Sequence, residues 1–381
     1  MQKGTFLKRC DEGQSSAGRG RSVPLRNVSG ASPNATPGGL GFRWPAEWEP
    51  HAGTWLTWPH NPDTWPGRLE AVAGTFAAIV RELHARETVN VLVADGAGEA
   101  RARRHLAAAG VGAQGGVRFH HLPSDDGWLR DCGPLFLVRA RAGRRERAAL
   151  LPGFNAWGGK YPPWERDAAL GRAVADAAGV RGFPSDLVLE GGSIDGDGRG
   201  SILTTESCLL HPNRGPGRTR EALEAALADL LGARAVLWLG AGIEGDDTDG
   251  HVDDVARFVA PGTVVAAAEP DPADPNHAPL AENLRRLRAL RDADGKPLAV
   301  AELPMPPRLS NGGARSPASY ANFYLANGLA LVPTFGAKSD ARALAVLREL
   351  LPGRDVVGIP CRELVAGLGA IHCVTQQEPA P

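Results

Sequence analysis

The sequence predicts an α/β protein built from many short strands. Beyond residue 40, short Val/Leu/Ile-rich runs alternate with Ala/Leu/Arg-rich stretches of helical length. The 381 residues include 48 Gly and 31 Pro, which are typical of many turns between short elements. Two helix-to-strand junctions, at 230–236 and 350–356, share Leu-Leu, Arg and Val positions. This echo indicates a repeated supersecondary unit.

The elements follow from these runs. Thr219 precedes a run that contains Glu221, and Ser339-Asp340 precedes Ala341, so a side-chain oxygen can accept a backbone N–H of each first turn. The predicted helices cover 68–86, 97–109, 165–178, 219–231, 280–292 and 340–351. The strands are predicted where Val, Leu and Ile lie between Gly, Pro or Asp residues. They cover 89–94, 117–122, 134–139, 148–152, 187–190, 201–205, 235–239, 255–259, 263–268, 298–303, 329–333, 355–359 and 371–375.

Residues 1–40 differ from the rest of the chain. They are dominated by Gly, Ser, Arg, Pro and Asn and show no periodicity of 2 or 3.6, which predicts a disordered tail. No linker composition interrupts the sequence after them. We therefore expect one domain over 41–381.

Charge and apolar content argue against several functions. Lys and Arg number 42 and Asp and Glu 43, so the formal net charge of -1 argues against broad binding to nucleic acids or anionic membranes. No apolar run approaches the roughly 20 residues that span a bilayer. The five cysteines are widely spaced, which favours free thiols in a reducing compartment over a disulfide framework. A cytoplasmic protein is expected.

Cys373 follows the glycine-rich stretch 367–369 and precedes a polar segment. Glycines permit close backbone approach, so a nucleophilic thiol is one interpretation. The alternative is a buried structural cysteine. His372 is not an obvious base for Cys373, because adjacent side chains of the predicted strand point to opposite faces.

A second candidate site is the acidic run 245–254, which contains His251. In an extended segment, His251 and Asp253 lie on the same face and form a usable acid/base and cation-binding pair. A calcium loop is a competing interpretation, but the EF-hand spacing is lacking. A solvated acidic loop is the other alternative.

Two further carboxylates stand beside glycines. Asp131 follows Trp128 and Arg130 before a Gly-Pro pair, and Glu190 ends an apolar run before two glycines. The alternative for Asp131 is an ordinary surface Arg–Asp pair, and the alternative for Glu190 is a solvent-facing residue at the end of a strand. Together with the thiol and the histidine, however, several carboxylates suit a guanidinium, which is planar, delocalised and protonated at neutral pH.

In order along the chain, these segments resemble the agmatine deiminase family of the guanidine-modifying (pentein) superfamily. The resemblance implies a five-bladed α/β propeller with pseudo-five-fold ββαβ-type repeats, and a single catalytic domain after the tail. The collinear motifs are GFRWPAEWEPH at 41–51, DGWLRDCGP at 126–134, FNAWGGKYPPW at 154–164, LEGGSIDGDGRGSILTTESCLL at 187–210, DTDGHVDDVARFV at 247–259, SYANFYLANG at 319–328 and IHCVTQQEP at 371–379.

The resemblance also implies roles. Cys373 looks like the nucleophile, His251 like the general acid/base, and Asp131 and Asp253 like the carboxylates that grip a guanidinium. Glu190 looks like the acid that orients the substrate or His251. The implied reaction converts agmatine to N-carbamoylputrescine and ammonia through an S-amidino-cysteine, in polyamine metabolism, without a metal or organic cofactor. The other four cysteines are predicted to be dispensable for the chemistry.

Substrate choice depends on two further residues. Asp247 is predicted to attract the terminal ammonium of agmatine, and Trp128 to cover its butyl chain, with core packing as the alternative for Trp128. The competing functions are deimination of peptidyl-arginine or another alkylguanidine, non-catalytic polyamine binding, and a metal-dependent hydrolase using His211, His251 and the acids of 246–254. A small-molecule guanidine is the expected partner, and the oligomeric state, including a homo-oligomer, is left open.

The chain departs from the family in one turn. The family commonly reads GGGNIHC there, whereas this sequence reads GLGAIHC. Leu368 disfavours a positive φ, and Ala370 has no side-chain amide for a hydrogen bond. Activity is expected because the thiol and histidine are retained, but rate and specificity depend on these two positions.

Overall fold

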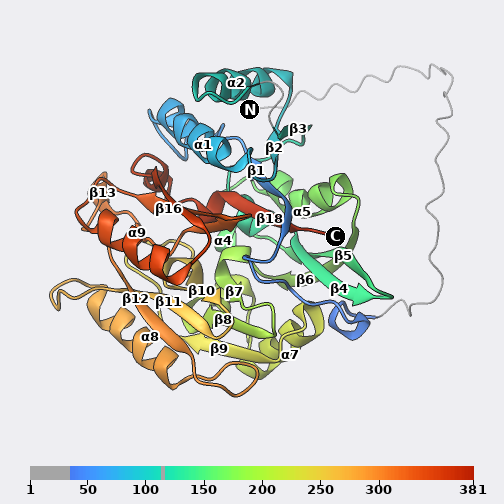
Figure 1. Cartoon of the computed structure of the whole chain (residues 1–381), viewed down its shortest axis with the longest axis vertical. Coiled ribbons are helices and arrows are strands. Elements are labelled where there is room, and N and C mark those ends of the chain that lie inside the picture. The colour runs from blue at the N-terminus through green and yellow to red at the C-terminus, as the bar shows by residue number, and fades with distance from the viewer. Residues whose placement is uncertain (1–34, 113–115) are drawn as a thin grey trace, which may run out of the picture. The chain divides into compact units, whose positions relative to one another are not determined.

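A strand–strand–helix–strand unit recurs through the residues that the computed structural model describes, 35–112 and 116–381. In each unit the first two strands pair antiparallel, and the second pairs parallel with the strand after the helix. A parallel pair needs such a crossover because both strands run in the same direction. Among the described residues, this ββαβ order occurs in five sheets (Figure 1).

Four of these units follow one another along the chain. They are β4 (Leu135–Arg141), β5 (Arg144–Gly153), α5 (Glu165–Ala177) and β6 (Arg181–Val188); β7 (Ile194–Gly196), β8 (Ser201–Thr205), α7 (Arg220–Leu231) and β9 (Ala235–Leu239); β10 (Ala256–Ala260), β11 (Thr263–Ala268), α8 (His277–Ala289) and β12 (Ala299–Pro304); β15 (Tyr324–Ala326), β16 (Leu329–Thr334), α9 (Ser339–Leu350) and β17 (Asp355–Pro360).

The fifth sheet joins the two ends of the compact unit Thr36–Pro381. β18 pairs antiparallel with β1, so that Leu56 lies opposite Thr375 and Trp55 opposite Gln376. Figure 1 shows the red strand β18 beside the blue strand β1. The elements of this sheet are β1 (His51–Thr57), α1 (Leu69–Leu83), β2 (Thr88–Val93), α2 (Gly96–Ala108), β3 (Val117–His121) and β18 (Thr375–Pro379). The last strand thereby completes a sheet that the first strand begins.

The helices pack against the sheets through apolar faces. In α1, the side chains of Val72, Phe76, Ile79 and Leu83 recur every three or four residues and are fully buried. Burying one such side chain contributes about 1.5–3 kcal/mol. These faces place the core between helices and sheets.

Short segments near the ends of the strands meet one another. α3 (Leu129–Cys132), η2 (Gly191–Ser193), η4 (Val252–Asp254) and η6 (His372–Val374) come from distant parts of the chain, and α3 contacts η2 and η6 while η2 contacts η4. The remaining short elements are η1 (Gly38–Leu40), α4 (Ala156–Gly159), α6 (Glu206–Leu209), η3 (Pro212–Arg214), β13 (Ser310–Asn311), β14 (Ala314–Arg315) and η5 (Leu364–Gly367). The meeting segments carry most of the candidate site residues.

The α/β class, the six longer helices and most of the strands are confirmed. The five-bladed closure stays a prediction. Two predicted strands are wrong in position. Instead of 187–190, the strand is β6 (Arg181–Val188), and Glu190 lies beyond its end. The start of β6 was not predicted because Gly182 and Pro184 are unusual inside a strand. The strand expected at 371–375 is instead the 3-10 turn η6 followed by β18, so polar residues, and not Val374, form the strand.

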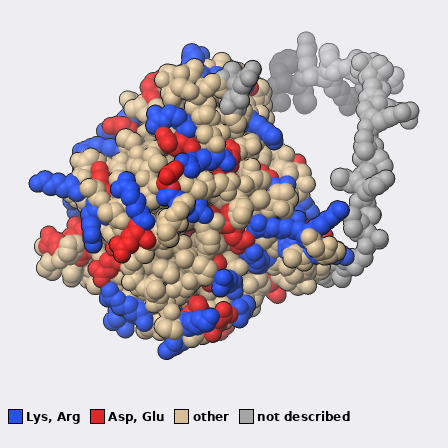
Figure 2. All heavy atoms as spheres, viewed as in Figure 1, with Lys and Arg blue, Asp and Glu red and all other residues tan. Residues whose placement is uncertain are grey.

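Residues 1–34 lie outside the described residues, and so does nearly all of the predicted tail. Among the described residues, no helix is long and apolar enough to cross a membrane. Basic and acidic side chains both occur across the face shown in Figure 2. This mixture fits the formal net charge of -1.

A buried ionic network lies under the meeting segments. Arg257 donates from Nε to Asp195 (2.7 Å) and from Nη1 to the carbonyl of Phe323 (2.8 Å). Its Nη2 lies 2.9 Å from a carboxylate oxygen of Glu47, which also receives Arg130 at 3.3 Å. Because these charges are almost fully buried, each depends on its partner for compensation.

We expect Arg257→Met to lower the free energy of unfolding by about 3–5 kcal/mol, because it leaves Asp195 and Glu47 buried without this cation. Denaturant unfolding measures the loss. Arg288→Met, at an exposed pair with Glu302, is the control and should cost less than about 1 kcal/mol. Equal losses in the two variants would show that the buried network adds nothing to stability.

Candidate active site

A pocket of about 770 Å³ opens beside the meeting segments. Four of the predicted residues line it: Cys373, Asp131, Trp128 and Asp247. The structure therefore brings the predicted thiol and one of the predicted guanidinium-binding carboxylates to the same cavity. The other three predicted residues are buried behind this wall, as their contacts show.

Cys373 lies in η6 and is 9% exposed. Asn322 donates from Nδ2 to its Sγ at 3.1 Å, while Asn322 Oδ1 accepts the backbone N–H of His372 at 2.9 Å. One amide therefore orients both the thiol and its turn. Burial, together with Asp253, Asp254 and Asp131, raises the pKa of the Cys373 thiol well above its usual value. Without a bound cation, the thiol is protonated at neutral pH.

His372 lies between two carboxylates. Its Nδ1 is 2.7 Å from Asp253 Oδ2, and its Nε2 is 2.8 Å from Glu47 Oε2. Burial alone would raise the pKa of both carboxyl groups, but the pKa of Asp253 is lowered by His372, and that of Glu47 is lowered by Arg257 and His372. Both ring nitrogens of His372 therefore lie within hydrogen-bond distance of a buried carboxylate, so the ring links Asp253 to Glu47. The strand expected at His372 was wrong, because the residue lies in the 3-10 turn η6. Its side chain is hydrogen-bonded to Asp253.

Asp131 sits in α3 with both carboxylate oxygens partnered. Oδ1 accepts the backbone N–H of Gly192 and Oδ2 accepts the indole N–H of Trp157, each at 3.0 Å. Burial raises the pKa of Asp131 to about 6, with His251 opposing and Asp253 and Glu190 adding to the shift. The surface-pair alternative is wrong, because Arg130 is buried and turns to Gln377 and Glu47.

His251 is buried immediately before η4. Its backbone N–H donates to Asp246 Oδ2 at 2.9 Å, and its ring Nδ1 lies 3.7 Å from Asp131 Oδ2. Burial alone would lower the pKa of His251, but Asp131, Cys208 and Asp253 raise it well above its usual value. The ring is therefore a cation at neutral pH.

The acidic run is not a solvated loop. Asp246 accepts the backbone N–H groups of Thr248 and His251, and Asp249 accepts from Lys160 (2.8 Å) and Asn213 (2.9 Å). Protein donors thus occupy both carboxylates. These hydrogen bonds shape the chain that presents His251.

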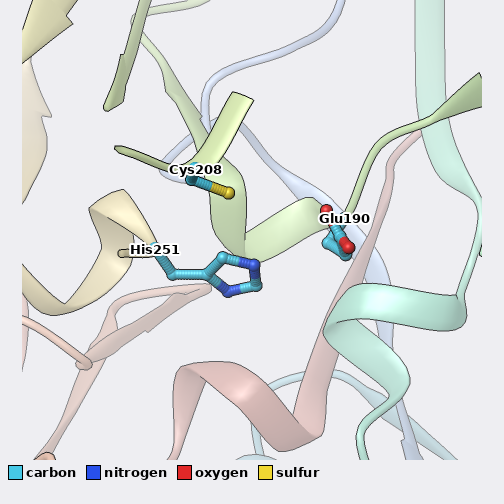
Figure 3. Close-up of side chains that lie close together, drawn as sticks. All are labelled: Glu190, Cys208 and His251. Atoms are coloured by element: carbon cyan, nitrogen blue, oxygen red, sulfur yellow. The ribbon is translucent and has the colours of Figure 1, made fainter. Parts of the chain in front are cut away.

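Glu190, Cys208 and His251 offer atoms that lie within 4.8 Å of one another (Figure 3). Among the described residues this is the group able to hold a metal, and His211 is not part of it. However, Arg214 Nε donates to both Glu190 oxygens, at 3.1 and 3.3 Å, and burial raises the pKa of the Cys208 thiol, which opposes the thiolate that a metal needs. The chemistry favours a hydrogen-bonding cluster. Cys208, grouped in the sequence with the dispensable cysteines, is a neighbour of His251.

Gly192 makes this convergence possible. A Cβ there would lie 2.6 Å from His251 Nδ1, 2.9 Å from Asp131 Oδ1 and 3.0 Å from Asp253 Oδ2. Real side chains do not approach so closely, so glycine is required. The Gly-Gly pair after Glu190 was the signal in the sequence for this close approach.

Strained backbone presents two of the pocket residues. Trp157, whose indole holds Asp131, has φ 54°, and Leu368 has φ 74°. The left-handed region costs a side-chain-bearing residue about 1–2 kcal/mol. The sequence indicated a conflict between Leu368 and a positive φ, and Leu368 does adopt a positive φ in the structure.

The outer wall contains the two predicted substrate-binding residues. Asp247 accepts the hydroxyl of Tyr161, and Lys160 donates to its backbone carbonyl. Burial raises the pKa of Asp247, and Asp246 adds to that shift. Trp128 packs on Trp65, with ring centroids 5.2 Å apart, and also lines the pocket. Trp128 therefore both packs in the core and lines the pocket.

Sequence reasoning missed the partners that hold these groups. Asn322, Trp157 and Glu47 lie inside the quoted motifs, but nothing in their own spacing indicated a role. Arg214 lies outside every quoted motif. In the sequence it is a single arginine after Pro212-Asn213, and nothing beside it indicated a role. Their contacts join residues from 24 to 325 positions apart, as in the Arg214–Glu190 and His372–Glu47 pairs.

Comparisons with known proteins agree with this geometry. A family described as Porphyromonas-type peptidyl-arginine deiminase matches residues 43–379. Agmatine deiminase of Pseudomonas aeruginosa (strain LESB58) is 39% identical over 375 residues, covering 92% of this chain and 99% of the relative. The solved agmatine deiminase of Enterococcus faecalis is 34% identical, with a TM-score of 0.85, and covers 92% of this chain and 99% of its own.

A third relative is a C. jejuni agmatine deiminase that carries a cysteine-to-serine change and has substrate bound. It is 27% identical, with a TM-score of 0.80, and the match covers 89% of this chain and 96% of that one. The sequence match, the shared fold and the thiol–histidine–carboxylate cavity all point to one group of proteins. The chain belongs to the Porphyromonas-type peptidyl-arginine deiminase family and has the α/β pentein fold of solved agmatine deiminases.

Proposed function

We propose that the protein hydrolyses agmatine to N-carbamoylputrescine and ammonia, with Cys373 as the covalent nucleophile. The observation that carries this proposal is the thiol of Cys373, 3.8 Å from Asp253 Oδ2, facing the same pocket as Asp131. A thiol between two buried carboxylates suits a cationic carbon electrophile. Relatives named agmatine deiminase, at 39% identity, support agmatine as the substrate.

Asp253 and Asp131 bind the guanidinium in this proposal. Among the described residues, Asp253 Oδ1 is buried and has no hydrogen-bond partner. An unpaired buried carboxylate oxygen is costly, and a guanidinium N–H would satisfy it. His372 occupies the other oxygen of Asp253 and so fixes the direction in which Oδ1 points.

Substrate binding also activates the thiol. The carboxylates that raise the pKa of Cys373 are the groups that a bound guanidinium neutralises. The thiol then releases its proton to water, because His251 is already protonated, and the thiolate attacks the central carbon to give a tetrahedral adduct.

His251 is the general acid and then the general base. As an imidazolium beside Asp131, it donates a proton to the departing ammonia when the C–N bond breaks, leaving an S-amidino-cysteine. The neutral ring then takes a proton from water, which attacks the same carbon. Breaking the C–S bond releases the ureido product and the thiol. Glu190, anchored by Arg214, orients His251.

Ammonia release from agmatine, arginine and an arginyl peptide tests the proposal directly. Agmatine should be turned over, and Cys373→Ser should lose essentially all activity while it stays folded, because a hydroxyl is a far poorer nucleophile at neutral pH. Cys361→Ala, a buried cysteine away from the pocket lining, is the control and should stay active. Preferred turnover of the arginyl peptide would replace agmatine by peptidyl-arginine, and an active Cys373→Ser would remove the nucleophile assignment.

The pH dependence tests Asp131. Guanidinium binding needs the ionised carboxylate, and the pKa of Asp131 in the free protein is about 6. Because kcat/KM reports the free enzyme, we expect protonation of Asp131 to add a further fall of about tenfold per pH unit in kcat/KM below about pH 6. Asp131→Asn should lower kcat/KM at least about tenfold, because it removes a charged hydrogen bond to the substrate. The additional fall in kcat/KM below about pH 6 should be absent in this variant. An unchanged fall in the variant would assign it to another group.

Asp247 tests the choice between agmatine and arginine. Its carboxylate on the pocket wall should attract the ammonium of agmatine and repel the carboxylate of arginine. Asp247→Asn should narrow the ratio of the two kcat/KM values. Tyr161→Phe removes the hydrogen bond to Asp247 but leaves its charge, so it should keep the ratio. If the ratio survives in Asp247→Asn, the discrimination lies elsewhere in the pocket.

A further inference from the structure

The turn Gly367-Leu368-Gly369 obeys two different constraints. A Cβ at Gly367 would lie 2.3 Å from Nε1 of Trp65. A Cβ at Gly369 would lie 2.4 Å from the ring of Trp128 and 3.1 Å from the Cβ of Cys373. Both positions need glycine because there is no room for a side chain.

Leu368 shows the opposite situation. Its φ of 74° is a conformation that favours glycine, yet the residue carries a branched apolar side chain. That side chain is partly exposed, and Leu368 lines the pocket together with Trp128 and Cys373. The unfavourable backbone conformation of this turn thus occurs at Leu368, the residue of the turn whose side chain borders the cavity.

The place of Leu368 relative to the thiol follows from chain geometry. Consecutive Cα atoms are about 3.8 Å apart, so Leu368 stands one residue from the glycine that touches Cys373 and Trp128. Many of the other groups around the cavity are polar, among them Asp126, Asp131 and Asp247. An alkyl chain leading from a guanidinium at Cys373 needs an apolar wall, and Leu368 and Trp128 can supply one.

We propose that Leu368 is a specificity-determining residue whose side chain contacts the alkyl segment of the substrate and selects unbranched ω-guanidinoalkyl chains. The inference rests on the proposed function and deepens it. Each methylene removed from water at such a wall is worth about fourfold in affinity. A leucine that narrows the cavity also disfavours a guanidine whose chain is branched close to the reacting carbon.

Strain alone does not explain Leu368, because the chain offers a comparison. Ala142 also has a positive φ, 50°, but lies in the exposed turn between β4 and β5 and does not line the pocket. Its left-handed conformation serves a tight hairpin with Gly143. Ala142→Gly therefore relaxes a similar backbone without touching the site, and it is the matched control.

The experiment compares Leu368→Gly, Leu368→Asn and Ala142→Gly with the unmodified protein. Asn tolerates a positive φ and keeps some bulk but is polar, so both Leu368 variants fold without added strain. The substrates are methylguanidine, agmatine and the ω-guanidinoalkylamines with one methylene fewer and one more. The readouts are KM and kcat by ammonia release, and the thermal midpoint.

We expect the Leu368 variants to lose about 4- to 20-fold in kcat/KM for agmatine, mostly through KM, and to lose much less for methylguanidine, which has no chain to contact. Their dependence on chain length should flatten, and their thermal midpoints should not fall. Ala142→Gly should keep every kinetic ratio. Equal losses on all substrates, or an unchanged chain-length profile, would overturn the assignment of Leu368.

Binding keeps the test independent of turnover. Calorimetry of the same four guanidines on the Cys373→Ser protein, with and without Leu368→Gly, measures the chain-length preference directly. If the unmodified protein releases no ammonia from agmatine, the proposed function fails, yet the binding series still decides whether Leu368 reads the alkyl chain. A flat series in the presence of Leu368 would overturn the inference even if agmatine is turned over.

Discussion

The ring of His372, held by hydrogen bonds between the carboxylates of Asp253 and Glu47, is the interaction on which the rest of the site depends. It connects the last turn of the chain with η4 and with a glutamate near the start of the described residues. Without this ring, Asp253 would lose the hydrogen bond to its Oδ2, and a buried carboxylate oxygen without a partner is costly. Because Cys373 is the next residue, the group that stabilises this centre also positions the thiol.

The same arrangement concentrates negative charge where a cation is to bind. Most carboxylate oxygens here receive protein donors, such as Gly192 and Trp157 on Asp131 and Arg214 on Glu190. Asp253 keeps one oxygen without a donor among the described residues. This oxygen makes the free state unfavourable, the proposed guanidinium would relieve that cost, and the left-handed residues beside the pocket add local strain. Such costs are tolerated at binding sites because the remainder of the fold compensates them.

The sequence carried much of this in local patterns. The sequence predicts α7 to within one residue, whereas α1 ends at Leu83, three residues before its predicted end. The Glu190-Gly-Gly stretch and the resemblance indicated the chemistry. What local patterns could not indicate is long-range pairing: β1, which was not among the predicted strands, is held by β18 and β2 on its two sides. Likewise, Asn322 and Glu47 are hydrogen-bonded to Cys373 and His372, far along the chain, so the neighbouring sequence gave no indication of their roles.

The pairing of β18 with β1 has a consequence for how the protein comes into being. The thiol precedes that closing strand by two residues, so it leaves the ribosome just before the strand that completes the first sheet. Every other candidate site residue emerges earlier, and the nascent chain carries the carboxylates before it carries the nucleophile. A chain cut short before residue 373 therefore lacks both the strand that completes the first sheet and the proposed nucleophile. Completion of the first sheet and the appearance of the proposed nucleophile thus coincide during synthesis.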